Sequence, residues 1–191
     1  MDEGFKNPNS RRSWWATFFG AFGRNSSGSS LIEFAIVAAP LLVLMFLILE
    51  VGLVYLANGE LENAVAQGAR MIRTGEAQSQ NFDAGKFKTQ VCQYLTALLD
   101  CAHLTLDVRT FSSFGSTNLT NPLDGAGNLK SGFSYQPGVG GQIVIVRAFY
   151  EWDLPAKLPK AINGMQVSLS NMADGNLLLI ATQAFRNEPF N

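Results

Sequence analysis

The chain has 191 residues, of which 15% are charged, and its formal net charge of −1 provides no basic face or stripe of the kind that nucleic-acid binding needs. We therefore expect no nucleic-acid partner. A length of this order favours one globular domain with appendages. Apolar residues make up 47% of the chain but are concentrated between Leu31 and Ala57, which leaves a modest domain for the rest of the sequence.

The first predicted element is a membrane-spanning helix. Residues 34–49 carry no charged or strongly polar side chain, and after Glu50 the apolar character resumes up to Leu56. Phe34 to Leu56 is 23 residues, or about 35 Å of helix, which is enough to cross a hydrocarbon core of roughly 30 Å. A cleaved secretory signal is the alternative, but the run is longer than the usual apolar region of such signals and no cleavage motif of the A-x-A kind follows it. We therefore expect the chain to stay anchored.

The distribution of basic residues predicts the orientation of this span. Four basic residues precede it, whereas only two lie within twenty residues after it. The positive-inside rule then places residues 1–30 in the cytoplasm and the bulk of the chain outside. The six residues are Lys6, Arg11, Arg12 and Arg24 before the span, and Arg70 and Arg73 after it.

Pro40 lies inside the predicted span, where it removes one backbone hydrogen bond and favours a kink in the helix. Membrane helices tolerate such prolines when neighbouring groups satisfy the backbone. Two interpretations remain open: a kink without consequence, or a point where the helix melts locally as it packs into an assembly.

Helical periodicity continues beyond the span. Leu61, Val65, Gly68 and Ile72 form a row at spacings of four, three and four residues. We therefore expect one helix from about Ser29 to about Thr74, with Gly75 as its stop.

The remainder of the chain predicts a small α+β head. A second helix is expected over about 84–99, because Phe87, Val91, Leu95 and Leu98 line one face. Alternating or apolar runs over 104–111, 142–152 and 176–185 indicate three strands. We expect these strands to form a three-stranded antiparallel sheet packed on the helices. Residues 115–141 are rich in Gly, Asn, Ser and Pro and predict a long surface loop.

Cys92 and Cys101 are the only cysteines of the chain. Nine residues of continuous helix would separate them by about 13.5 Å, far beyond the roughly 7 Å between Cα atoms that a disulfide allows. If they pair, the second helix must end between them, near Leu99 or Asp100. An oxidising compartment favours pairing. Two buried free thiols are the alternative.

The sequence contains no pattern that indicates catalysis. His103 is the only histidine, and a Cys-His nucleophile pair needs contact in space and an orienting partner. A metal site is disfavoured, because His103 alone could join the two cysteines as a ligand. The glycines at 138–141 lack the helix start and lysine of a phosphate-binding loop. We expect no enzyme activity, no metal and no cofactor.

The residues just before the apolar run carry the most specific pattern. A basic leader is followed by Gly28, then Ser29, then Glu33 and Phe34 at the mouth of the span. This order resembles the class III signal of type IV pilin-like proteins. The resemblance implies that an inner-membrane prepilin peptidase cuts after Gly28, that Ser29 becomes the N-terminus, and that Glu33 is the fifth residue of the mature chain.

Cleavage would create an α-amino group with a reference pKa of about 7.7–8.0, which is largely positive near neutral pH. Glu33 of a neighbouring subunit could pair with this amine at the membrane boundary. Such a pair would set the axial register between helices. The alternative is a glutamate that simply reaches out to the membrane interface.

The resemblance narrows to TadE/TadF-type pseudopilins of the tight-adherence (Flp) pilus system. It is carried by Glu33-Phe34, Pro40 and the acidic-x-glycine string at Glu50–Gly52, and by segments at residues 91–111 and 181–190. The resemblance implies a leader over residues 1–28, a transmembrane part over 29–57 and a periplasmic pilin-like head over 58–191.

Two functions follow as expectations. The first is a minor pilin or pseudopilin that takes part in the priming or assembly of a tight-adherence pilus. Its partners would be the prepilin peptidase, other pilins through the N-terminal helix, the inner-membrane assembly platform and membrane lipid. The second is an uncleaved single-pass membrane protein whose periplasmic domain binds a ligand or adheres to a surface.

Overall fold

The structure is a computed structural model that describes residues 29–96, 98–153 and 170–190. The expected leader and Gly28 lie outside the described residues. The chain divides into two compact units, Met1–Val51 and Gly52–Asn191. The expected α+β class is confirmed: a long N-terminal helix, a further helix and a three-stranded antiparallel sheet.

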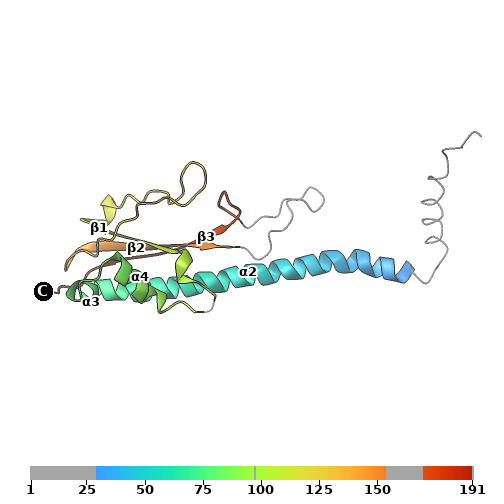
Figure 1. Cartoon of the computed structure of the whole chain (residues 1–191), viewed down its shortest axis with the longest axis horizontal. Helices are drawn as coiled ribbons and strands as arrows, with labels where there is room; N and C mark the ends of the chain where they lie inside the picture. Colours follow the sequence, from blue (N-terminus) through green and yellow to red (C-terminus); the bar gives the residue numbers. More distant parts are fainter. Residues whose placement is uncertain (1–28, 97, 154–169, 191) are drawn as a thin grey trace, which may run out of the picture. The chain divides into compact units, whose positions relative to one another are not determined.

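Helix α2 (Ser29–Arg73) is a single run of 45 residues and matches the expected helix closely (Figure 1). Its C-terminus is closed by local hydrogen bonds, since the Thr74 N–H and hydroxyl both donate to the Arg70 carbonyl at 3.0 Å. Gly75 follows with φ of 81°, a left-handed conformation that glycine adopts without the penalty of a Cβ atom. The predicted stop at Gly75 is therefore confirmed.

The second helix is shorter than the sequence predicted. After the single turn of α3 (Glu76–Ser79), α4 runs over Ala84–Cys92, and the Asp83 carboxylate caps it by accepting the Lys86 N–H at 2.7 Å. The expectation of a helix up to residue 99 was wrong. The chain turns after Cys92 because Cys92 and Cys101 are joined in a disulfide, with Cα atoms 5.6 Å apart. A continuous helix cannot bring them that close.

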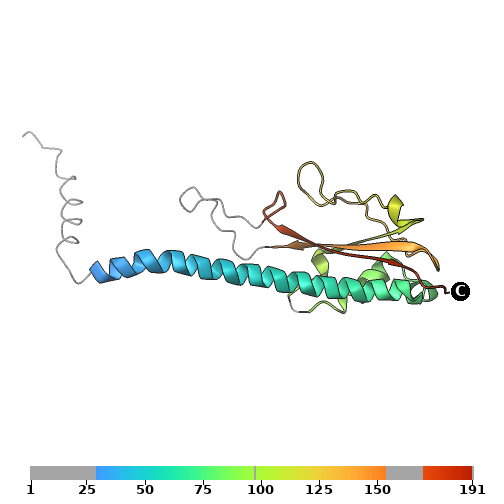
Figure 2. The ribbon, with the colours of Figure 1, turned by 180° about the vertical axis from the view of Figure 1, so that it is seen from behind.

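The three strands lie within one residue of their predicted bounds. They are β1 (Leu104–Phe111), β2 (Ile143–Trp152) and β3 (Leu177–Arg186), in the order β1-β2-β3 with both pairs antiparallel. Figure 2 shows the strands side by side along the part of α2 that follows Gly52. A short 3-10 turn, η3 (Cys101–His103), leads into β1.

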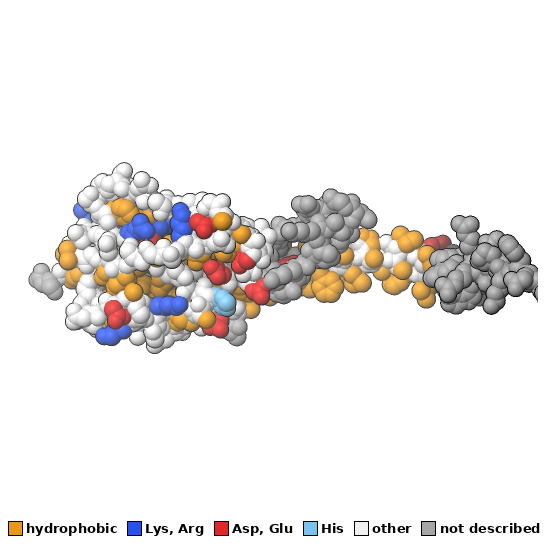
Figure 3. All heavy atoms as spheres, turned by 45° about the horizontal axis from the view of Figure 1, so that its top comes forward, with side chains coloured by type: hydrophobic (Ala, Val, Ile, Leu, Met, Phe, Trp, Pro, Cys, Tyr) orange, Lys and Arg blue, Asp and Glu red, His pale blue; other side chains and the backbone are white. Residues whose placement is uncertain are grey.

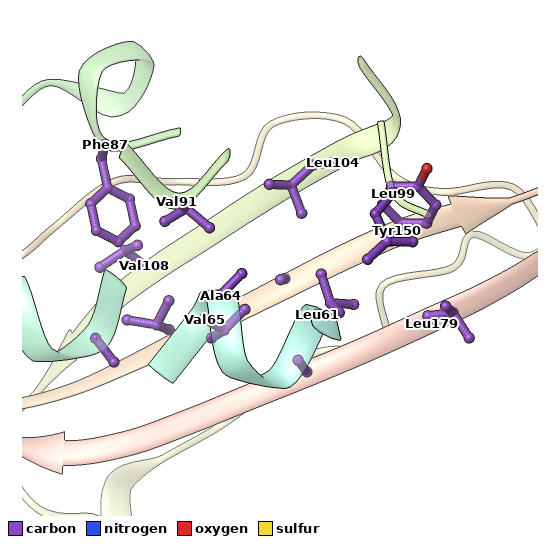
Figure 4. Close-up of a cluster of buried hydrophobic side chains, with 14 of the residues drawn as sticks. Leu61, Ala64, Val65, Phe87, Val91, Leu99, Leu104, Val108, Tyr150 and Leu179 are labelled. Atoms are coloured by element: carbon purple, nitrogen blue, oxygen red, sulfur yellow. The ribbon is translucent and has the colours of Figure 1, made fainter. Parts of the chain in front are cut away.

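The main core lies between the sheet and the helices (Figure 4). Helix α2 contributes Leu61 and Val65, and α4 contributes Phe87 and Val91, all fully buried. The two helices approach closely at Gly68, where a Cβ atom would stand 2.7 Å from a methyl carbon of Val91. The strands contribute Leu104, Val108, Val144, Val146, Ala148, Tyr150, Trp152, Leu179 and Ala181.

The opposite face of the sheet is covered by irregular chain. The expected long loop over 115–141 is indeed irregular apart from η4 (Phe114–Ser116), but it is not only a surface loop. Its half-buried Leu123, Leu129 and Phe133 pack on a second cluster formed by Phe149, Met172 and Leu178. The same segment also covers the free edge of β1, because the Val108 N–H donates to Ser134 at 2.7 Å and the Val108 carbonyl accepts from Gln136 at 2.9 Å.

Candidate assembly interface

The first half of α2 exposes a continuous series of large apolar side chains, seen along the helix in Figure 3. Leaving such area in water is unfavourable by about 25 cal/mol per Å², so this half of the helix requires lipid or protein around it. Of the described residues, one helix is long and apolar enough to cross a membrane, by length and composition alone, and it is this one. The exposed residues are Leu31, Ile32, Phe34, Ile36, Val37, Leu41, Leu42, Leu44, Met45, Phe46, Ile48, Leu49, Val51, Leu53, Tyr55 and Leu56.

Of the residues predicted to act in processing and register, Ser29, Glu33 and Phe34 lie at the start of this helix, whereas Gly28 lies outside the described residues. Because α2 begins at Ser29, Glu33 lies one turn further on the same face, about 6 Å along the axis. Glu33 and Phe34 are both exposed, Phe34 to 72%. The helix therefore presents a carboxylate and an aromatic ring one turn after the expected new N-terminus. The roles of Gly28, Ser29, Glu33 and Phe34 remain predictions.

Helix α2 continues on both sides of Pro40. Proline has no N–H, so the carbonyl of Ile36 lacks its usual donor four residues on. This places a weakened backbone hydrogen-bond ladder within the exposed apolar half. A kink at Pro40 remains a prediction.

Glu50 differs from the other residues of this half of α2 because it is only 8% exposed. Its Oε1 atom is buried and has no hydrogen-bond partner among the described residues. A buried acceptor without a donor is unfavourable by about 1–3 kcal/mol. In helices that cross a membrane, an ionisable residue of this kind is a candidate functional residue by default. The resemblance had already singled out Glu50 as the second acidic position of the helix.

In the head, Cys92 and Cys101 form the disulfide that the sequence allowed, and no cysteine is free. The segment between them is tied to α2 by Glu60, whose carboxylate accepts hydrogen bonds from the backbone N–H and, at 2.7 Å, from the hydroxyl of Thr96. It is tied to the sheet by the Asp100 N–H, which donates to the Tyr150 hydroxyl at 2.9 Å. Three separate links thus hold this segment in place.

A buried ion pair that sequence reasoning missed lies on the other face of the sheet. Asp107 on β1 is 1% exposed and accepts hydrogen bonds from Arg147 on β2, at 2.6 Å from Nη2 and 3.2 Å from Nε. Arg109 and the Ser134 N–H also donate to Asp107, each at 3.0 Å. Arg147 in turn donates to the Thr120 carbonyl at 3.0 Å. The pair therefore fixes the covering segment onto the sheet.

Burial alone would raise the pKa of Asp107, but the hydrogen bonds from Arg147, Ser134 and Arg109 outweigh it and hold the pKa below the usual 3.8. A lone arginine in the most apolar strand was the one sequence signal for this site. Its partner lies forty positions away, which no local pattern reveals.

The C-terminal residues close the far end of the head. The Phe190 ring lies against Gly75, where a Cβ atom would stand 2.6 Å from it, and the Glu188 N–H donates to the Arg73 carbonyl at 2.9 Å. Asn187 is buried and donates through its side chain to the carbonyls of Pro137 and Val139 at 3.0 and 3.1 Å. The end of α2, the segment at 137–141 and the C-terminus are thus joined.

His103 is exposed at η3, with its ring centroid 6.2 Å from that of Tyr150. Within residues 29–96, 98–153 and 170–190, no three His, Cys, Asp or Glu side chains gather in a way that could hold a metal ion. The described residues offer a helix with an exposed apolar half and a head that is cross-linked by a disulfide.

The comparisons with known proteins agree with this description. The model of the family described as TadE-like protein matches residues 28–70, which cover the start of α2, its apolar half and its first turns in the head. No curated protein and no solved structure matches the chain. The resemblance to TadE-like proteins predicted from the sequence is therefore confirmed over residues 28–70.

Proposed function

We propose that this protein is a minor pilin or pseudopilin that takes part in the priming or assembly of a tight-adherence pilus. The observation that carries the proposal is the single helix α2, whose exposed apolar half begins at Ser29 and whose second half is built into the head. The match to the TadE-like family over the same residues supports it. The role is structural: the helix packs with other pilin helices, and the head presents a surface to periplasmic or pilus partners.

In this proposal a prepilin peptidase removes residues 1–28 on the cytoplasmic side of the inner membrane. The new amine at Ser29 is then positively charged near neutral pH. Residues 29–57 cross the membrane, and residues 58–191 form the periplasmic head. The inner-membrane assembly platform and surrounding lipid are the further partners.

Glu33 has the specific role of setting the axial register between subunits. An amine and a carboxylate on neighbouring helices offset one another's charge at the membrane boundary, and such charge-assisted pairs are among the stronger hydrogen bonds. Because Glu33 lies about 6 Å along the axis from Ser29, a neighbour displaced by about one helical turn would align the two groups.

Processing and assembly can be tested separately. Gly28→Glu should leave the chain at full length on a gel, because a bulky charged residue blocks the peptidase, whereas Gly28→Ala should still be cut. Glu33→Ala should be cut normally but reduce the amount of pili sheared from cells. Glu62→Ala, an exposed glutamate on the head part of α2, is the matched control and should leave pili unchanged. Normal piliation with Glu33→Ala would refute the register role.

A further inference from the structure

The segment between the two cysteines contains exposed apolar side chains close to the end of the apolar stretch of α2. Tyr94 and Leu98 are each 40% exposed, although the segment is fastened on three sides. Its neighbour Leu99 is buried in the core, so the segment is anchored rather than loose. Two exposed apolar side chains are ordinary on a protein surface, so what distinguishes this segment is where it lies along α2.

The position of this segment along α2 follows from the hydrogen bonds that Thr96 donates to Glu60. The last exposed apolar residue of the helix is Leu56, and Tyr55 beside it is 79% exposed. Tyrosine is enriched where a helix leaves the hydrocarbon core. Four residues of helix separate Leu56 from Glu60, which is about 6 Å.

The polar headgroup layer extends about 5–8 Å beyond the hydrocarbon on each side of a bilayer. Thr96, bonded to Glu60, therefore lies at headgroup depth when Leu56 marks the edge of the hydrocarbon. Tyr94 and Leu98 are each two residues from Thr96, so their Cα atoms lie within about 7 Å of it. Both side chains can reach the boundary between headgroups and acyl chains.

We infer that the disulfide-bounded segment, residues 93–96 and 98–100, is a membrane-contacting edge of the head. Its occupant is the lipid headgroup layer, which Tyr94 and Leu98 enter. The chemistry of the segment favours lipid contact through apolar and aromatic burial, because residues 93–100 include no Lys or Arg that would seek anionic headgroups. The inference rests on the membrane span of the proposed function and adds a second contact between head and membrane.

The contact has a structural consequence. A helix alone leaves its head free to rotate about the helix axis at the membrane surface, whereas a second contact fixes one side of the head toward the lipid. The disulfide and the Glu60 bond keep the segment in position for that contact. The side of the head that carries the segment would then face the membrane before any assembly step.

Fluorescence quenching in lipid nanodiscs tests the contact. The full chain is purified with Leu98→Cys, labelled with an environment-sensitive dye, and placed in phosphatidylcholine nanodiscs that carry a nitroxide on the headgroup or on the acyl chain. Both native cysteines are in the disulfide, so the new thiol is labelled specifically. Leu119→Cys is the matched control, because Leu119 is also 40% exposed but lies in the segment that covers the other face of the sheet.

We expect headgroup nitroxide to quench the Leu98→Cys label at least about twofold more than the Leu119→Cys label, at low and high salt alike, because aromatic and aliphatic contacts at the interface do not depend on charge. Tyr94→Cys should behave as Leu98→Cys does, which guards against a local folding defect in one variant. Equal quenching of Leu98→Cys and Leu119→Cys overturns the inference. So does a Leu98→Cys label that is shielded from water but not quenched by lipid, since a protein then covers it.

A label at Leu44→Cys, in the apolar half of α2, separates this inference from the proposed function. Quenching of that label by acyl-chain nitroxide, together with no excess quenching at Leu98→Cys, overturns the membrane-contacting edge and leaves the span intact. Absence of quenching at Leu44→Cys overturns the span, and the inference with it.

Discussion

Replacing Asp107 by alanine should be one of the most destabilising single changes in the head. Asp107 accepts hydrogen bonds from two arginines and a backbone N–H, and its carboxylate is 1% exposed. Without it, Arg147 stays buried at 5% exposure and keeps only its bond to the Thr120 carbonyl and its position over the Phe149 ring. Leaving one member of a buried pair uncompensated costs about 3–5 kcal/mol.

That loss is a large part of the stability of a domain of this size, which is about 5–15 kcal/mol. Removing both charges should cost much less, because replacing a buried ion pair by apolar side chains is often neutral or stabilising by about 1–4 kcal/mol. The double variant Asp107→Leu/Arg147→Met should therefore be more stable than Asp107→Ala. Arg109→Ala is the control and should cost much less than Asp107→Ala, because Arg109 is 31% exposed and its loss leaves Asp107 paired with Arg147 and Ser134.

The assay is urea denaturation of the full chain in detergent, followed by near-ultraviolet circular dichroism, with the difference in unfolding free energy as the readout. We expect the wild type, Arg109→Ala and the double variant to have similar unfolding free energies. Asp107→Ala should have a much lower one. Equal midpoints for Asp107→Ala and wild type, or a double variant as unstable as Asp107→Ala, would show that the buried pair does not stabilise the head in this way.

Three further predictions concern the head. Hydrogen bonds hold the pKa of folded Asp107 below its usual 3.8, so the stabilisation from this carboxylate is present above 3.8 and is lost as the pH falls from there through the lower pKa of the folded state. As the pH is lowered from about 5 to about 2, the wild type should lose more stability than Asp107→Leu/Arg147→Met, and parallel losses would contradict this. Replacing both Cys92 and Cys101 by serine should lower the unfolding free energy by about 2–3 kcal/mol, measured in the same assay, while a reducing agent should have that effect on the wild type and none on the variant. Gly68→Val should lower the unfolding free energy by about 1–3 kcal/mol through overpacking against Val91. Gly59→Val is the control and should cost much less, because a Cβ atom at Gly59 meets nothing within 4 Å. Similar losses of stability in both variants would show that helix propensity, and not packing, determines the effect.

Periodicity in the sequence predicted the elements whose stability is local. The 45-residue helix could be predicted from its apolar run and from the row of apolar residues with helical spacing that follows the run. The end of the helix could be predicted from Gly75, because the left-handed backbone conformation there favours glycine. The three strands could be read because each alternates or is uniformly apolar over eight to ten residues. These patterns act within a few residues of chain, so one sequence suffices to find them.

Features set by distant contacts could not be predicted in this way. The second helix ends at Cys92 and not near residue 99, because the disulfide and the hydrogen bonds to the Glu60 carboxylate hold the following residues in a non-helical conformation. The amphipathic row through Leu95 and Leu98 suggested helix where tertiary contacts decide otherwise. Propensity is a weak prior that such contacts override.

The covering segment over 115–141 shows the same limit. Leu123, Leu129 and Phe133 pack on the sheet, but their irregular spacing matches neither a helix nor a strand period. For the candidate interface, the sequence was enough to locate the apolar helix and the residues at its N-terminal end, including Glu33 and Phe34. In the proposed function these residues act through contact with a second subunit, and a single sequence does not reveal such a contact.

The proposed function requires that a prepilin peptidase cleaves the chain and that the mature form begins at Ser29. Intact-mass analysis of the protein purified from membranes of cells that make the pilus tests this directly. We predict a mass that corresponds to a chain beginning at Ser29, whereas a strain without the peptidase should yield a chain that still carries residues 1–28. Retention of residues 1–28 in the strain that has the peptidase would contradict cleavage and favour an uncleaved membrane-anchored protein.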